Sequence, residues 1–135
     1  MKATFDINST LFQILKGSTQ LNEAISGGVY VDERPDNSEK EDVVVNTIDL
    51  TQEYLPQLGS SNVNIHVKDL TVNIKGVQQS KQNTKRLKEL TAQVLSVLRE
   101  AKIEGIAMVV TNQNVIKERE VKQHYTNIRI DWVIH

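Results

Sequence analysis

The chain has 135 residues, a length that fits one α+β domain spanning residues 1–135. It contains 16 basic and 17 acidic residues, so its formal net charge is -1. Such a balance argues against a general nucleic-acid binder, which carries a basic excess. The absence of cysteine excludes disulfides, thiolate zinc sites and cysteine nucleophiles, and the 4% of aromatic residues leaves the core to Val, Ile and Leu, of which the β-branched ones favour strands.

Neither a membrane span nor a signal peptide is predicted. No apolar stretch approaches the ~18 residues of a membrane helix, and the start of the chain, Met1 to Asp6, lacks the apolar run of a signal peptide. We therefore expect a soluble, intracellular protein.

Two short helices are predicted first. Residues 9–16 place Leu11, Phe12, Ile14 and Leu15 on one side, and Gly17 ends this helix. A second one runs over residues 19–25, until the glycine pair at 27–28 breaks it.

Three strands follow, over residues 29–31, 43–50 and 62–68. The loop between the first two, residues 32–42, holds six acids and two bases. The second strand has Val43 and Val45 on one face and Val44, Ile48 and Leu50 on the other, which indicates a central strand covered on both sides. The third alternates apolar and polar residues and predicts one buried face. Residues 51–61 are predicted to be a loop.

The second half of the chain predicts one long helix and two more strands. Residues 69–82 read as a short edge strand around Val72 and Ile74 followed by mobile loop. Residues 84–101 form an amphipathic helix, from the spacing of Leu87, Leu90, Thr91, Val94, Leu95, Leu98 and Ala101. Residues 106–110 are a strand apolar on both faces, followed by a turn around residues 112–114. The last strand, residues 125–134, alternates, and residues 116–123 could extend either strand of a long hairpin.

The element order is therefore α-α-β-β-β-α-β-β. Strand runs separated by one long helix predict an α+β fold. We expect a mostly antiparallel or mixed sheet of about five strands, with the long helix across one face and the short N-terminal helices beside it.

No motif predicts catalysis, a cofactor or a metal. Phosphate-binding glycine loops, GxSxG, HExxH and EF-hand spacings are absent from the sequence. His66 and His124 could form a metal pair with an acid if their strands are neighbours, although exposed histidines are the usual case. We expect no catalytic residue, cofactor or metal ligand, and hence no enzyme; an enzyme would need these two histidines to converge.

The charged residues suggest a binding surface instead. From Lys75 to Lys88 there are five bases and no acids, and several lie at the start of the long helix, where the macrodipole disfavours cations. A partner's acidic surface or nucleic acid could favour them there; solubility is the other explanation. An acidic loop and a basic patch on one chain suit head-to-tail contacts that close into rings. The candidate partner-binding residues are Arg34, Asp36, Glu39, Glu41, Lys81, Lys85, Arg86 and Lys88.

Short motifs along the chain resemble those of phage and prophage tail-completion proteins, the tail-terminator-like minor tail proteins. They are Leu11-Phe12-Gln13-Ile14-Leu15, Gly27-Gly28-Val29-Tyr30, Arg34-Pro35, Glu41-Asp42-Val43-Val44-Val45-Asn46, Gln57-Leu58-Gly59, Asn62-Val63-Asn64-Ile65-His66-Val67 and His124-Tyr125-Thr126-Asn127-Ile128-Arg129-Ile130.

The resemblance implies a structural virion-assembly protein without enzyme activity or cofactor. It would cap the tail tube or join tail to head, often as a hexameric ring, with copies of itself and tail-tube or head-completion proteins as partners and without membrane or nucleic acid. Its location would be the host cytoplasm during assembly, or the virion. The alternative is a small α+β binding module of a mobile element that contacts nucleic acid or protein through the basic patch from Lys81 to Lys88.

Overall fold

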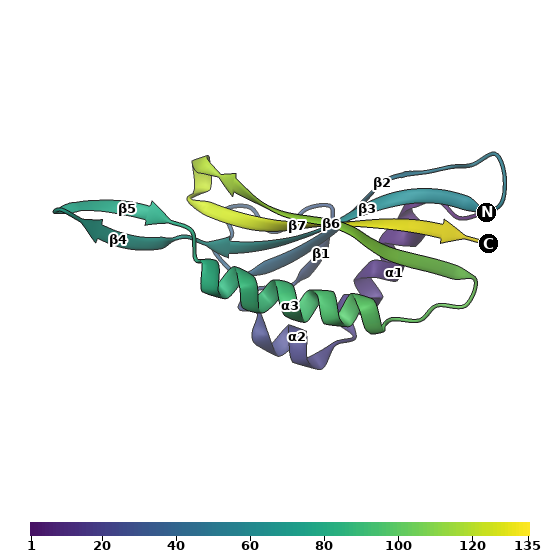
Figure 1. The fold of residues 1–135 in the computed structure, drawn as a ribbon, viewed down its shortest axis with the longest axis horizontal. Helices are drawn as coiled ribbons and strands as arrows, with labels where there is room; N and C mark the ends of the chain where they lie inside the picture. Colours follow the sequence, from purple (N-terminus) through teal and green to yellow (C-terminus); the bar gives the residue numbers. More distant parts are fainter.

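A five-stranded mixed sheet, covered on one face by helices, forms the body of the protein, and a two-stranded hairpin projects from one end of it (Figure 1). The computed structural model describes residues 1–135. In chain order the elements are α1 (Thr4–Lys16), α2 (Thr19–Ala24), β1 (Val29–Val31), β2 (Asp42–Leu50), β3 (Gln57–Lys68), β4 (Leu70–Ile74), β5 (Val77–Lys81), α3 (Thr84–Glu100), β6 (Ile106–Glu118), the 3-10 turn η1 (Arg119–Val121) and β7 (Gln123–Ile134). The predicted α+β class is confirmed.

The sheet order is β1-β2-β3-β7-β6, with β1 and β2 parallel and every other pair antiparallel. Helix α1 packs on β1 and β2, and α3 packs on β3, β6 and β7, so the core lies between the helices and one sheet face. The predicted apolar stripe of α3 is buried there through Leu87, Leu90, Val94 and Leu98. From β7 the same core receives Ile128, Ile130, Trp132 and Ile134, as its alternation predicted. No helix has the length and apolar character needed to cross a membrane.

Helix α1 begins five residues earlier than predicted. Asp6 Oδ2 accepts a hydrogen bond of 2.8 Å from the backbone N–H of Ala3, which satisfies a donor that a helix start leaves free. Ile7 then joins Leu11 and Leu15 on the face that is fully buried. The carboxylate in the first turn marks the start of this helix.

Strand β2 contains a bulge that changes which residues reach the core. Its register against β3 shifts between Thr47 and Asp49, because a bulge places one extra residue on one strand. Leu50 therefore joins Val43 and Val45 in the core, and Ile48 is 51% exposed on the other side. The prediction that Ile48 and Leu50 share a face was wrong.

Strand β3 begins at Gln57, inside the predicted loop of residues 51–61. Gly59 suggested a turn, but it lies opposite Leu50 and Trp132 within the sheet. A Cβ at this position would lie 2.6 Å from the carbonyl oxygen of Asp49, so the glycine allows the bulged strand to approach closely.

Two predicted loops are also strands. The turn expected at residues 112–114 is part of β6, which pairs with β7 until Glu118 and bulges between Val110 and Asn112. The predicted long hairpin is confirmed: residues 116–118 extend β6, Gln123 begins β7, and residues 119–122 form the turn between them. Residues 69–82, predicted as an edge strand and mobile loop, contain the β4–β5 hairpin, whose turn residues Lys75 and Gly76 both have positive φ, 51° and 80°. Such a pair is typical of a two-residue hairpin turn.

Candidate interaction surfaces

Asp42 fixes the acidic loop of residues 32–41 to the sheet. Its carboxylate, 1% exposed, accepts hydrogen bonds from the N–H of Gly28 at 3.1 Å, from Arg34 Nη1 at 3.2 Å and from Ser38 Oγ at 2.6 Å. Arg34 also donates through Nη2 to Gln123 Oε1 on β7. The side chain of Arg34, a predicted partner-binding residue, thus binds two residues of its own chain and is only 15% exposed.

Glu41 and Arg86, two further candidates, bind each other. Arg86 Nε lies 2.5 Å from Glu41 Oε2, and Nη2 lies 2.9 Å from Oε1, while Nη2 also donates to the carbonyl of Ala24. The hydrogen bond to Glu41, opposed by burial, raises the pKa of Arg86 further above its already high value. Because Glu41 and Glu89 face this cation, its position at the start of α3 is electrostatically favourable despite the macrodipole.

The remaining candidates lie at the surface. Glu39 forms an exposed ion pair of 3.3 Å with Lys68. Asp36 is exposed on the acidic loop, and Lys81, Lys85 and Lys88 are exposed near the start of α3; none of the four makes an ion pair. The lysines are therefore available to a partner.

His66 and His124 do not form a common site. In the antiparallel register His66 lies opposite Tyr125 and Val67 opposite His124, so the two histidines point to opposite faces of the sheet. His124 Nδ1 lies 2.5 Å from Asp69 Oδ1. No group of three His, Asp or Glu residues has the geometry of a metal site.

His66 occupies a buried position near Glu118. Glu118 Oε1 lies 2.9 Å from Nδ1, but the angles do not make a hydrogen bond, and Nδ1 has no other partner. Burial, reinforced by the nearby Arg34 and opposed by Asp42, lowers the pKa of His66 to about 4. The side chain is therefore neutral at neutral pH and part of the packing at this end of the sheet.

The helix-free face of the sheet carries a network of amides. Asn62 Oδ1 accepts from Asn127 Nδ2 at 3.1 Å and from Arg129 Nε at 3.0 Å, and Asn127 Nδ2 also donates to Asn64 at 2.7 Å. Asn46 accepts from Asn62 at 3.0 Å. The alternation in the sequence showed these positions as polar but gave no sign that they bond to one another across strands.

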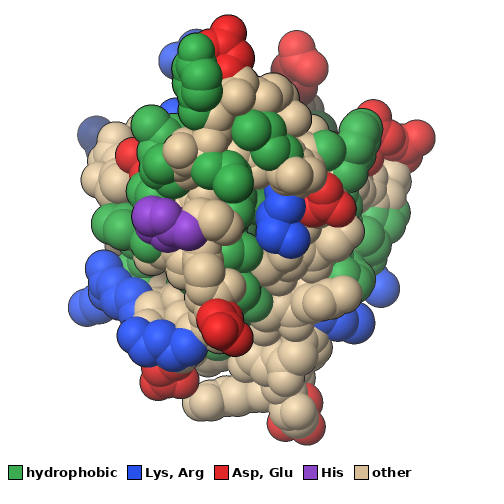
Figure 2. Space-filling model, turned by 90° about the vertical axis from the view of Figure 1, so that its right-hand side faces the viewer, with side chains coloured by type: hydrophobic (Ala, Val, Ile, Leu, Met, Phe, Trp, Pro, Cys, Tyr) green, Lys and Arg blue, Asp and Glu red, His purple; other side chains and the backbone are tan.

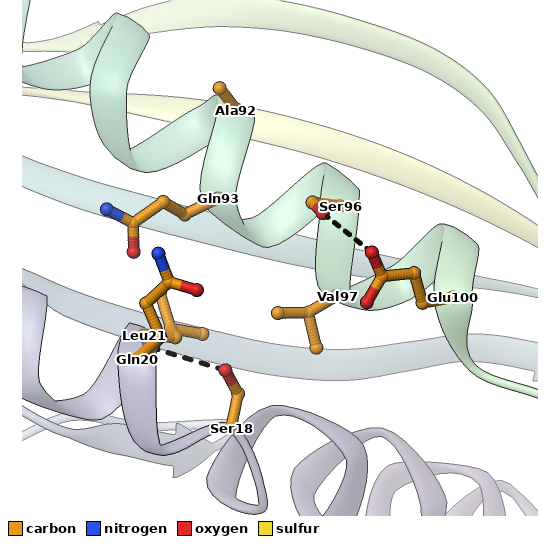
Figure 3. Close-up of a pocket in the computed structure, with 8 residues that line it drawn as sticks. All are labelled: Ser18, Gln20, Leu21, Ala92, Gln93, Ser96, Val97 and Glu100. Carbon is orange, nitrogen blue, oxygen red and sulfur yellow. Dashed lines mark hydrogen bonds between the residues drawn. The ribbon is translucent and has the colours of Figure 1, made fainter.

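A cavity of about 300 Å³ lies between α2 and α3. Figure 3 shows Gln20 and Gln93 facing each other across it, with Ser18 and Leu21 below and Ser96 and Glu100 on α3. Ser18 Oγ caps α2 by accepting from Leu21 N at 3.2 Å, and Ser96 donates to Glu100 at 3.3 Å. Glu100 is the one acidic or basic side chain in the lining, so the cavity lacks an acid–base pair.

No family model and no curated protein matches this chain. Among solved structures, a chain of the "virion of native gene transfer agent (GTA) particle" superimposes on it with a TM-score of 0.70. The superposition covers 99% of this chain and 98% of that chain, at 11% sequence identity. The two chains therefore share one fold along nearly their whole length.

Proposed function

We propose that this chain is a structural virion-assembly protein of the tail-terminator or tail-completion type, without enzyme activity or cofactor. It caps the tail tube or joins the tail to the head, as a ring of identical copies for which a hexamer is the expected size, in contact with tail-tube or head-completion proteins. The observation that carries the proposal is the full-length likeness to a chain of a gene transfer agent virion. The resemblance of short motifs in the sequence to those of tail-completion proteins also favours it.

The surfaces of the chain agree with an assembly role. The cavity between α2 and α3 holds a single ionisable residue, Glu100, whereas acid–base catalysis requires placed groups of matched pKa. Charged loops and exposed apolar residues lie instead at the two ends of the sheet, where contacts with other subunits can form.

Electron microscopy of particles assembled without the protein tests this proposal. If the protein stops tube growth, tails lengthen beyond their normal range; if it joins tail to head, free heads and free tails accumulate. Supplying the unaltered gene from a plasmid should restore complete particles. Normal tails attached to heads in the absence of the protein would contradict both forms of the proposal.

Nucleic acid is the second candidate partner, because Lys81, Lys85 and Lys88 are exposed and unpaired within a segment that has no acid from residue 70 to residue 88. The logarithm of a DNA association constant falls with the logarithm of salt by about 0.9 for each phosphate that a protein neutralises. A double variant, Lys85→Gln with Lys88→Gln, is then expected to reduce that slope by about 2. Lys102→Gln, an exposed lysine beyond α3, is the control; an unchanged slope in the double variant would exclude this patch as the DNA contact.

A further inference from the structure

The β4–β5 hairpin has an apolar face that nothing in the chain covers. By register, Leu70, Val72, Ile74 and Val77 share one side with Gln79 and Lys81, while Thr71, Asn73, Gln78 and Ser80 share the other. Leu70 is 48% exposed, Ile74 41% and Val77 59%. No other helix or strand packs extensively on either strand, and Figure 1 shows the hairpin extending away from the body.

A hairpin of this kind needs a covering surface. The body holds it at its base, where Ser80 Oγ donates to Asp69 Oδ2 at 2.9 Å. An isolated two-stranded hairpin is marginally stable in water, and exposed apolar faces mark contact sites. The amphipathic pattern therefore indicates a partner on the apolar side.

A second uncovered apolar surface lies at the opposite end of the molecule. We call it the end patch; it comprises Ile48, Tyr54, Leu55, Leu58 and Val109, with exposures of 51%, 75%, 60%, 53% and 55%. These residues come from the end of β2, the loop that follows, and the starts of β3 and β6. Figure 2 views this end directly and shows hydrophobic side chains gathered across its centre, with acidic and basic side chains and a histidine among and around them.

The hairpin segment carries only basic charges, and acids outnumber bases beside the end patch. The segment from residue 70 to residue 88 contains no acid, and Lys75 occupies the tip of the hairpin. Within or beside the end patch lie three exposed acids, Glu53, Asp49 and Asp131. One exposed base, Lys2, also lies there, and its backbone bonds to the side chains of Gln52 and Gln57. The basic hairpin and an apolar patch with more acids than bases can attract each other between copies, but they cannot meet within one molecule.

We propose that the hairpin of one copy docks with its apolar face on the end patch of the next copy. Because the two surfaces differ, the contact is head-to-tail, and repetition closes a ring or extends a filament depending on the rotation between copies. The inference rests on the self-association in the proposed function and names the surfaces that produce it. The proposed contact differs from the head-to-tail contact between the acidic loop and the basic patch that the sequence suggested. One pair of residues from those two segments, Glu41 and Arg86, already bind each other within one chain.

Site-specific cross-linking tests the contact, because the chain has no native cysteine. An Ile74→Cys preparation is mixed in turn with Tyr54→Cys, Leu58→Cys, Val109→Cys and, as control, Val121→Cys, an exposed apolar residue outside the end patch. After treatment with a short bismaleimide, mixed dimers are expected with the patch variants and little or no mixed dimer with the control. Equal yields, or no mixed dimer with any patch variant, would overturn the proposal.

Sedimentation provides an independent measurement of the same contact. Ile74→Asp places a charge on the apolar face of the hairpin and is expected to raise the dissociation constant of self-association at least about tenfold. Asn73→Asp places the same charge on the polar face and should leave it unchanged. Both positions lie outside the core, and circular dichroism confirms that each variant is folded.

The results separate this inference from the proposed function. If the unaltered protein is monomeric at every concentration, or if Ile74→Asp associates as tightly as Asn73→Asp, the docking is refuted while the tail-length experiment still decides the assembly role. If particles without the protein have normal tails, the assembly role is refuted and the cross-links still decide the contact.

Discussion

Replacing Asp42 by Ala is expected to lower the free energy of unfolding by about 3–5 kcal/mol, the usual cost of removing one partner from a buried ion pair. The substitution leaves Arg34, 15% exposed, without its carboxylate, and removes the acceptor for the N–H of Gly28 and for Ser38 Oγ. Urea denaturation followed by circular dichroism measures this loss. Limited proteolysis should also show faster cleavage within residues 32–41, because Asp42 fixes that loop to the sheet.

Two further variants serve as comparisons for the unfolding free energy of Asp42→Ala. Asp42→Asn keeps an oxygen acceptor but loses the charge, so its stability should lie between those of the unaltered protein and Asp42→Ala. Glu39→Ala removes the exposed pair with Lys68 and should cost no more than about 0.5 kcal/mol, as exposed ion pairs do. If Asp42→Ala and Glu39→Ala cost the same, the loop is not held by Asp42.

The second large effect is expected at Trp132, the only tryptophan of the chain. Trp132→Ala should lower the free energy of unfolding by about 3–5 kcal/mol, because it leaves a large cavity in a core whose walls relax only in part. The side chain is 1% exposed and belongs to the cluster between the helices and the sheet. Its Nε1 donates to Ser61 Oγ at 2.8 Å.

Trp132→Phe separates the packing from the hydrogen bond. Phe keeps most of the apolar volume, and Ser61 Oγ retains Thr47 Oγ1 at 2.8 Å, so a loss of about 1–2 kcal/mol is expected. The unfolding must be followed by circular dichroism, since both variants lack the native fluorophore. An equal loss for Phe and Ala would show that the hydrogen bond, and not the filled volume, provides the stability at this position.

The elements that the sequence predicted well are those in which one periodicity runs without interruption. The buried stripe of α3 from Leu87 to Leu98, and the alternation of β7 from Thr126 to Ile134, each bury one face. Burial of that face is the largest stabilising contribution to either element, so the pattern of apolar residues is enough to identify it.

The errors occurred where backbone pairing overrides local preference. Gly59 and the segment of residues 112–114 carry residues typical of turns, yet both lie in strands. Each is held by hydrogen bonds to a strand distant in the sequence, and β-propensity depends on that context. The bulge in β2 likewise depends on its neighbour β3, so the sequence of β2 alone could not show that Ile48 faces away from the core.

The α+β class, the order of the main helix and strands, and the positions of the charged segments follow from the sequence alone, because periodicity and composition are local properties. The tertiary structure sets which charges remain free. Arg34 pairs with Asp42 and Glu41 with Arg86, whereas Lys81, Lys85 and Lys88 are left to solvent. It also placed the apolar face of the hairpin and the end patch at opposite ends of one molecule. Both outcomes depend on the packing of segments far apart in the chain, because the interaction of two side chains depends on their distance in space and not on their distance along the sequence.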